Sequence, residues 1–376
     1  MRDRELSRRF PVLLIWAMIL LLTVFLCVSE KKEFSEQENR YLSSFPEFSW
    51  EALKDGDYTA DLESYLADHF PFRDFFMGVK TGFELFTGSK EINDVYIAKD
   101  GYLIEKYQKP MNTEKIIRVF NSLDEAVTEA EVYLMLVPTA SEIYADKLPK
   151  NAPVGSQMAT LTQIYEETEC EAVYVADALR EQKGSEEALF YRTDHHWTSY
   201  GAYVAYQEFC KVQGFEAVEL SAMQEKTVTE EFKGTIYSKV NDYTHEGDAI
   251  TIYENPSQKL TVHYTDTGEV TDSLYNYEYL EKKDKYSFFL NNIHPMIEIT
   301  NEAADTEREL VLVKDSYANC MVPFLVNHYS KVYVIDPRYY KNAVSELVNE
   351  NTAHTDILLL YNMNTIDTDL GIGGIY

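Results

Sequence analysis

The chain has 376 residues, of which 45% are hydrophobic and 26% charged; this excludes a wholly disordered or collagen-like protein and allows two domains or one large α/β domain with insertions. Lys and Arg number 34 against 63 Asp and Glu, and the resulting net charge of −29 disfavours nucleic acid as a partner. Four cysteines are too few for a disulfide framework in so long a chain, and the absence of a CxxC pair or a Cys/His cluster gives no sign of structural zinc.

An uncharged apolar run lies near the N-terminus. Residues 11–28, PVLLIWAMILLLTVFLCV, carry no charge, and with Phe10 and Ser29 the run reaches 20 residues, the length of a membrane-spanning helix. Arginines outnumber acidic residues before it, which predicts a cytoplasmic tail at 1–10, a transmembrane anchor at 11–29 and an extracellular remainder.

The alternatives to a membrane anchor are a cleaved signal peptide and a soluble cytoplasmic protein. A signal peptide has a shorter apolar region and small residues before its cleavage site. Val24 and Leu26, ahead of Cys27, fit neither that site nor a lipoprotein signal. We therefore expect the single-pass anchor, with the catalytic domain outside the cell membrane.

The segment after the apolar run differs in composition from the rest of the chain. Residues 30–57 are polar, with Pro46 as a helix breaker, and predict a stalk. Residues 58–86 show helical spacing of apolar side chains, interrupted by HFPFRD at 69–74, which predicts two helices. Further predicted elements are strands at 95–97 and 102–104 and a helix at 113–129.

Short apolar strands then alternate with helix-length polar stretches. The continuous apolar runs are typical of strands covered by helices on both faces, so we predict an α/β fold with a parallel sheet flanked by helices. Alternating patterns at about 215–300 predict β-hairpins inserted into this core, and the whole domain is predicted at 58–376. The predicted strands are 132–138, 172–177, 310–315, 331–336 and 356–362.

The motif TDHHWTSYGAY at 193–203 places one carboxylate and two imidazoles side by side. Three interpretations stay open for these residues: a metal site, an acid–base site, or the first turn of a helix capped by Asp194 and Thr193 with Trp197 in the core. A metal site normally draws its ligands from separated positions, and no HExxH motif accompanies these residues.

The motif LVLVKDSYAN at 310–319 runs from a buried strand directly into Ser316. Ligands of α/β proteins bind at the carboxyl ends of the strands, and backbone N–H groups after the strand can stabilise an oxyanion. The alternative is an ordinary helix cap, with Pro323 delaying the helix to near Val322.

The two motifs together supply the parts of a nucleophilic site. A serine hydroxyl needs a base to take its proton, and a third group must hold that base in one tautomer. Ser316 can be the nucleophile, either His195 or His196 the base, and Asp194 the orienting carboxylate.

Six segments resemble the DHHW protein family, which itself resembles the SGNH-hydrolase-like proteins of alginate and cell-wall polysaccharide O-acetylation. The resemblance implies an SGNH-hydrolase-like fold and the triad Asp194, His196 and Ser316, with Asp and His preceding Ser. No clear glycine or asparagine motif for the oxyanion hole is found, and Asn291 and Asn292 are the candidate hydrogen-bond donors. The segments are ENR at 38–40, HFPFRD at 69–74, VPTASEIYADKLP at 137–149, TDHHWTSYGAY at 193–203, FKGTIYSK at 232–239 and the run from 311 to 340.

Three more residues are candidates for substrate binding. Arg73 in HFPFRD could bind an anionic sugar, although a structural salt bridge is the favoured interpretation. Tyr317, next to the proposed nucleophile, and Trp197 could line the site, and Trp197 is equally suited to packing.

The resemblance implies a membrane-anchored extracytoplasmic O-acyltransferase, an O-acetyltransferase in the first instance, that modifies an exopolysaccharide or cell-wall glycan. A multi-span membrane O-acyltransferase would supply the acyl group, the polysaccharide would accept it, and no cofactor or metal is expected. A carbohydrate acetylesterase with the same triad, and a non-catalytic glycan-binding or scaffold subunit of an export machinery, remain alternatives.

Overall fold

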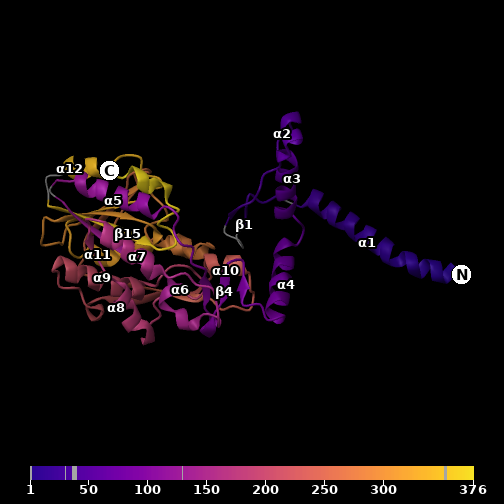
Figure 1. The fold of residues 1–376 in the computed structure, drawn as a ribbon, viewed down its shortest axis with the longest axis horizontal. Helices are drawn as coiled ribbons and strands as arrows, with labels where there is room; N and C mark the ends of the chain where they lie inside the picture. The colour runs from indigo at the N-terminus through magenta and orange to yellow at the C-terminus, as the bar shows by residue number, and fades with distance from the viewer. Residues whose placement is uncertain (1, 30, 36–39, 129, 351–353) are drawn as a thin grey trace. The chain divides into compact units, whose positions relative to one another are not determined.

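The computed structural model describes residues 2–29, 31–35, 40–128, 130–350 and 354–376. Glu38 and Asn39 of the ENR motif lie outside these residues. The chain divides into two compact units, drawn in Figure 1. The first contains residues 1–89 and 238–244, and the second contains residues 90–237 and 245–376.

The first unit begins with helix α1 (Arg2–Val28). Within it, the 19 residues Phe10–Val28 have a mean hydropathy of 2.8, and none of this stretch is buried. The helix is therefore long and apolar enough to cross a membrane, as a signal sequence near an N-terminus also would be.

Three helices follow in the first unit: α2 (Trp50–Asp55), α3 (Asp57–Asp68) and α4 (Arg73–Phe86). The break between α3 and α4 falls within HFPFRD, as predicted. Asp68 pairs with Arg40 at 2.5 Å and accepts the Ser43 N–H at 2.8 Å, which attaches the preceding segment to the end of α3. A two-stranded antiparallel pair, β1 (Phe34–Ser35) and β2 (Arg40–Tyr41), precedes α2.

The predicted domain boundaries at 30, 58 and 376 stay predictions. Residues 58–89, which the sequence analysis joined to the catalytic domain, lie in the first unit, together with residues 238–244 from the FKGTIYSK region.

The second unit contains an eight-stranded sheet with the order β11-β10-β12-β14-β13-β15-β6-β7. The five strands from β14 to β7 are parallel, whereas β12, β10 and β11 each pair antiparallel with their neighbour. The predicted α/β fold is confirmed, and the predicted parallel sheet holds for the five strands from β14 to β7 but not for β12, β10 and β11. The strands are β6 (Glu131–Val137), β7 (Glu171–Ala172), β10 (Leu260–Tyr264), β11 (Val270–Thr271), β12 (Met296–Asn301), β13 (Glu309–Lys314), β14 (Lys331–Ile335) and β15 (Thr355–Asn362).

The strand predicted at 172–177 is wrong over most of its length. Of the predicted residues only Ala172 lies in β7, which pairs with β6, and the chain then turns into helix α8 (Ala176–Glu181). Val173 and Val175 are buried while Tyr174 between them is exposed, and the Val173 N–H donates to the Leu134 carbonyl of β6 at 2.9 Å. The apolar run therefore covers the core from an edge position just beyond the end of β7.

Both faces of the parallel part of the sheet are covered. Leu310 and Leu312 of β13 point into one core, and Val311 and Val313 point into the other, because successive strand residues face opposite sides. Figure 1 shows α5 and α12 on one side of β15, and α8 and α9 on the other. The covering helices are α5 (Thr113–Ala126), α7 (Gln157–Glu167), α9 (Ser199–Gln213), α11 (Val322–Leu325) and α12 (Val344–Glu350).

The region 215–300 contributes strands to two places. β8 (Gln224–Phe232) and β9 (Asp248–Glu254) form a separate antiparallel pair, while β10, β11 and β12 extend the central sheet. A small three-stranded sheet consists of β3 (Glu91–Ile92), β4 (Val95–Ile97) and β5 (Leu103–Glu105). The hairpins predicted as an insertion therefore also complete the main sheet on its antiparallel side.

Candidate active site

Ser316 lies at the carboxyl end of β13, where the strand gives way to a 3₁₀-helix, Ser316–Cys320. The side chain of Asp315 holds this junction in place. Its Oδ1 accepts the Tyr317 N–H at 2.8 Å, and its Oδ2 accepts the backbone and side-chain N–H groups of Asn362 at 2.7 and 2.8 Å, as well as the Thr365 hydroxyl. Ser316 is thus positioned by contacts that join the ends of β13 and β15.

The TDHHW motif brings a histidine to this serine across 120 residues of sequence. His196 Nε2 lies 2.7 Å from Ser316 Oγ, and His196 Nδ1 lies 2.5 Å from Asp194 Oδ1. The Asp194 and His196 residues are only 3% and 5% exposed. The predicted Asp194, His196 and Ser316 therefore form one continuous chain of hydrogen bonds.

The second oxygen of Asp194 is bound by the segment that follows β8. Asp194 Oδ2 accepts the Thr235 N–H at 2.8 Å and the Thr235 hydroxyl at 3.0 Å. Gly234 makes this approach possible, since a Cβ there would lie 2.2 Å from Asp194 Oδ2. Both carboxylate oxygens thus have fixed donors, which hold the carboxylate against His196.

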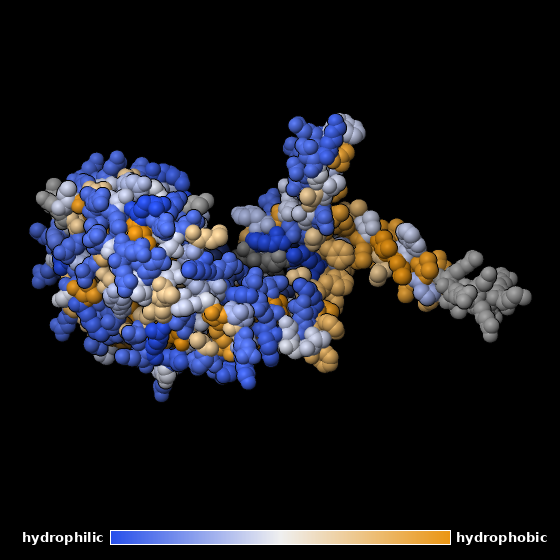
Figure 2. Space-filling model, in the orientation of Figure 1, coloured by the Kyte–Doolittle hydropathy of each residue, from blue (hydrophilic) through white to orange (hydrophobic). Residues whose placement is uncertain are grey.

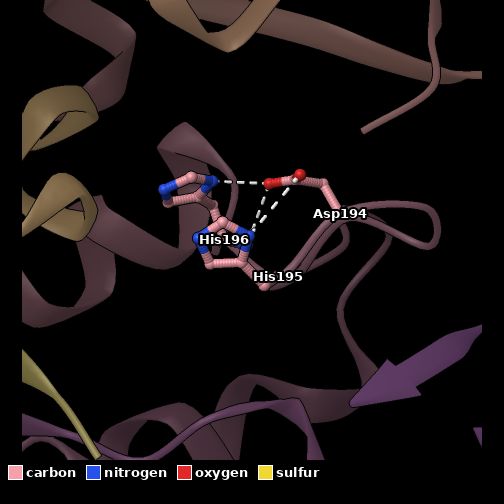
Figure 3. A group of neighbouring side chains, drawn as sticks. All are labelled: Asp194, His195 and His196. Atoms are coloured by element: carbon pink, nitrogen blue, oxygen red, sulfur yellow. Dashed lines mark hydrogen bonds and ion pairs between the residues drawn. The ribbon is translucent and has the colours of Figure 1, made fainter. Parts of the chain in front are cut away.

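His195 contacts the same carboxylate by a different route. Its Nδ1 lies 2.7 Å from the Thr235 Oγ1 and 3.7 Å from Asp194 Oδ2. Because the single hydroxyl proton of Thr235 goes to the carboxylate, His195 Nδ1 is the donor to Thr235. Figure 3 shows both imidazoles turned toward Asp194.

Burial and neighbouring charges set the protonation of the pair. Burial raises the pKa of Asp194, but the adjacent imidazoles and the hydrogen bonds from His196 and Thr235 outweigh this and hold the pKa well below its usual range. Burial, together with the charge of His195, lowers the pKa of His196 to about 4 against the opposing effect of Asp194. With both pKa values lowered, Asp194 is ionised and His196 is neutral at neutral pH. A neutral imidazole is the form of histidine that can accept a proton.

Tyr286 packs on the ring of His196, and Tyr317 holds the backbone beside it. Tyr286 stacks on the imidazole with ring centroids 3.7 Å apart and an interplanar angle of 9°, and its hydroxyl donates to the Ser316 carbonyl at 3.1 Å. The Tyr317 hydroxyl donates to the His195 carbonyl. The indole N–H of Trp197 donates to the Tyr317 carbonyl at 2.8 Å. Tyr317 and Trp197 are fully buried, so they pack beneath the triad, and contact with substrate stays a prediction.

Asn291 and Asn292 stabilise a loop before β12. Their φ angles of 56° and 79° are left-handed, a conformation that asparagine tolerates. Asn291 Oδ1 accepts from Asn276 at 2.7 Å, and Asn292 Oδ1 accepts the Ser287 hydroxyl at 3.1 Å. These contacts do not involve the triad, and an oxyanion role for either residue stays a prediction.

Arg73 begins α4 in the first unit, whereas Ser316 belongs to the second. Its role in binding an anionic sugar stays a prediction.

Asp194, His195 and His196 offer atoms that all lie within 4.8 Å of one another, and they are the group that could hold a metal ion among the described residues. Both ring nitrogens of His196 and both oxygens of Asp194 are already hydrogen-bonded to protein groups. This bonding favours acid–base chemistry over metal binding.

Four residues of this site were missed by the sequence analysis: Gly234, Thr235, Tyr286 and Asp315. The first two lie in the FKGTIYSK segment, whose presence among the shared motifs was the available signal. Asp315 directly precedes Ser316, but the sequence suggested no role for it beyond that of a helix cap. Tyr286 carried no signal, because its contact with His196 depends on the fold.

Comparisons with known proteins agree with this fold. A family model described as DHHW protein matches residues 86–335. A probable alginate O-acetylase AlgJ from Pseudomonas syringae pv. tomato is 25% identical over 182 residues, which are 44% of this chain and 46% of that protein. The chain thus matches less than half the length of this curated relative.

Two solved structures share the fold. A DHHW family protein from Eubacterium siraeum is 24% identical with a TM-score of 0.64, over 75% of this chain and 95% of that one. Bacillus cereus PatB1, solved with a sulfonyl adduct, is 19% identical with a TM-score of 0.61, over 74% of this chain and 98% of that one. Since the family model covers well over half of the sequence, the chain belongs to the DHHW protein family.

Proposed function

We propose that this chain is an extracytoplasmic O-acyltransferase with an SGNH-hydrolase-type fold that transfers an acetyl group to hydroxyls of a polysaccharide through an acyl-Ser316 intermediate. The observation that carries the proposal is the hydrogen-bonded series from Asp194 through His196 to Ser316 at the carboxyl edge of the sheet. A scaffold protein has no need of a buried, neutral histidine facing a serine hydroxyl.

The first half-reaction forms the acyl-serine. His196 Nε2 takes the proton of Ser316 Oγ as the oxygen attacks the acyl carbonyl, and Asp194 stabilises the imidazolium that forms. The tetrahedral intermediate collapses, the bond to the donor's leaving group breaks, and that group receives the proton from His196. The N–H of Tyr317 is occupied by Asp315, so the oxyanion has to be stabilised by other donors, of which the Ser316 amide is the nearest along the chain.

The second half-reaction transfers the acyl group to sugar. A glycan hydroxyl gives its proton to His196 Nε2 as its oxygen attacks the acyl carbon, and Ser316 Oγ leaves and regains that proton. Water at the same position would give an acetylesterase instead, and the fate of the acetyl group distinguishes the two.

The relatives support acetyl transfer to a polysaccharide as the class of reaction. One relative is named as an alginate O-acetylase, and PatB1 was solved with a sulfonyl adduct, the product expected when a sulfonyl reagent meets an activated nucleophile. The acceptor of this chain is inferred to be neutral or cationic, because a net charge of −29 repels a polyanion over distances within the screening length.

We further infer that α1 is an uncleaved single-pass anchor with a cytoplasmic N-terminus. The enzyme would then receive its acyl group from a multi-span membrane O-acyltransferase, since an anchored domain outside the membrane has no direct access to cytoplasmic acyl donors.

The test is an acyl-transfer assay on the full chain in detergent micelles, with an acetyl ester as donor and neutral or amino-sugar oligosaccharides as acceptors. We expect mass spectrometry to find acetyl-Ser316 and acetylated oligosaccharide. Ser316→Ala should abolish both, whereas the matched control Ser345→Ala, at a buried serine of α12, should retain both. Release of acetate alone in the presence of every acceptor would identify an esterase.

A further inference from the structure

Helix α4 in the first unit presents an apolar face to the solvent. The exposed fractions are 63% for Phe75, 48% for Phe76, 52% for Val79, 66% for Phe83 and 89% for Phe86. At 3.6 residues per turn, these five side chains fall within an arc of about 100° on the helix. Phenylalanines in one stripe of this kind are unusual on a surface facing water.

The opposite side of α4 already has a partner within the same unit. The Thr81 hydroxyl donates to the Val240 carbonyl at 2.6 Å, and the Tyr243 hydroxyl donates to the Asp74 carbonyl at 2.7 Å. Gly78 lies so close to Tyr243 that a Cβ would be 2.0 Å from its ring. The phenylalanine stripe is therefore the outer face of a helix whose inner face is packed.

The start of α4 lies beside the end of α1. The rings of Phe72 and Phe25 make an edge-on contact with centroids 5.6 Å apart. A cavity of about 350 Å³ is lined by Ser29, Lys31 and Lys32, which follow the apolar helix, and by residues 69–74. In Figure 2 the orange, apolar side chains of the first unit gather over α1 and along one side of α4.

Basic side chains border this apolar surface. Lys31 and Lys32 lie three and four residues after the end of α1, and Lys80 lies beside the stripe on α4, where it pairs with Glu84 at 3.8 Å. In a chain with 63 acidic and 34 basic residues, such a group complements the anionic headgroups of a phospholipid surface better than an acidic copy of the same chain.

We propose that α4 is an interfacial helix that lies on the outer leaflet, with the stripe from Phe75 to Phe86 among the acyl chains and the lysines at the headgroups. This inference rests on the proposed anchoring by α1, which would deliver the start of α4 to the bilayer surface. Amphipathic helices with phenylalanine on one face and basic residues at its border bind membranes in this way. The first unit would then rest on the bilayer and not merely connect to it.

The test measures the depth of α4 in the full chain reconstituted into phosphatidylethanolamine/phosphatidylglycerol vesicles. A Cys27→Ser background removes the exposed native cysteine, since the other three are buried. An environment-sensitive fluorophore is then attached in Phe83→Cys, and in the matched control Asp74→Cys, an exposed site on the other side of the helix. We expect acyl-chain-brominated lipid to quench the Phe83→Cys label several-fold more than the Asp74→Cys label.

Flotation of the same vesicles separates the inference from the anchoring on which it rests. Chain that floats with equal, weak quenching at both labels contradicts the interfacial helix while leaving the anchor intact, and chain that does not float contradicts both. A Phe83→Cys label that is shielded from water yet not quenched by brominated lipid shows a protein partner and overturns the lipid assignment. So does an unlabelled Phe83→Cys chain that forms a disulfide with a second copy when a mild oxidant is added. A Phe86→Cys label repeats the measurement should Phe83→Cys not fold.

Discussion

Asp194 is the residue on which the site depends, because one buried carboxylate organises two adjacent imidazoles. It binds His196 directly at 2.5 Å and His195 through the Thr235 hydroxyl. The two histidines are consecutive, yet only His196 turns its Nε2 to Ser316. The motif alone left either histidine as the base, and the resemblance selected the one that the hydrogen bonds now place beside the serine.

The two histidines should differ sharply in their effect on turnover. His196→Ala should lower the turnover of an acetyl ester roughly 100- to 10,000-fold, about as much as Ser316→Ala, because the two act as a unit. His195→Ala is the matched control and should retain most of the activity, since its Nδ1 reaches the carboxylate only through Thr235. Loss of activity in His195→Ala with retention in His196→Ala would refute the assignment of the base.

Gly234 should tolerate no side chain. In Gly234→Ala the new Cβ would lie 2.3 Å from the Asp194 Cβ, so the carboxylate has to move. We expect turnover to fall about 100-fold through misplacement of Asp194, and the free energy of unfolding to fall by about 1–3 kcal/mol through overpacking. Gly184→Ala is the control, because nothing lies within 4 Å of its Cβ position. Unfolding in urea and acetyl ester turnover would measure the two effects, and wild-type values for Gly234→Ala would contradict the described packing.

At the level of elements, the site depends on the joined ends of β13 and β15. Asp315, at the end of β13, accepts the backbone and side-chain N–H groups of Asn362 at the end of β15. Parallel strands end at the same edge of a sheet, so the ends of β13 and β15 lie close together. The hydrogen bonds of Asp315 join these two ends and thereby hold Ser316, the next residue, in place.

Replacing this carboxylate should loosen the junction. In Asp315→Asn, the amide NH₂ would face an N–H or O–H group that now donates a hydrogen bond to the carboxylate. Because that hydrogen bond would be lost, the free energy of unfolding should fall by about 1–3 kcal/mol, and the rate of Ser316 acylation should fall as well. Asp177→Asn, at an exposed acid of α8, should leave both unchanged. The urea midpoint and the acylation rate are the measurements; equal behaviour of the two variants would show that Asp315 does not support Ser316.

Local pattern predicted the elements that carry the site but not their partners. Continuous apolar runs identified β6, β13 and β15, which are buried on both faces, and also β14, whose Lys331 and Tyr333 are only half-buried. β12 lies at the end of the region predicted to form hairpins, and its residues alternate between half-buried and buried; its pairing with β14 is decided by contacts distant in sequence. Tyr286 was missed because its contact with His196 likewise joins residues distant in sequence. The strand predicted at 172–177 is wrong because residues 173–175 lie at the edge of the sheet, where an apolar run can cover the core without forming a strand.

At the scale of the whole molecule, the chain combines a unit that exposes apolar side chains with a unit that buries the carboxylate of Asp194 beside two histidines. The sequence predicted an apolar N-terminal helix and a large α/β domain, but it did not predict that residues 238–244 belong to the first unit. Contacts such as that between Tyr243 and Gly78 join residues more than 160 positions apart, and local sequence patterns do not predict such contacts.

Reactivity of Ser316 in the full chain as a function of pH tests the central claim most directly. A serine-directed sulfonyl fluoride is allowed to react at each pH, modified serines are identified by mass spectrometry, and tryptophan fluorescence checks that the chain remains folded. The neutral imidazole is the active base and burial lowers the pKa of His196 to about 4, so its reactive form persists as the pH falls below the ordinary histidine pKa of about 6.5. We predict modification of Ser316 alone, at a rate that is constant from neutral pH to about pH 5 and declines with a midpoint near 4, and that is lost in His196→Ala. A folded chain in which Ser316 reacts no faster than other serines, or reacts equally well in His196→Ala, would contradict the account.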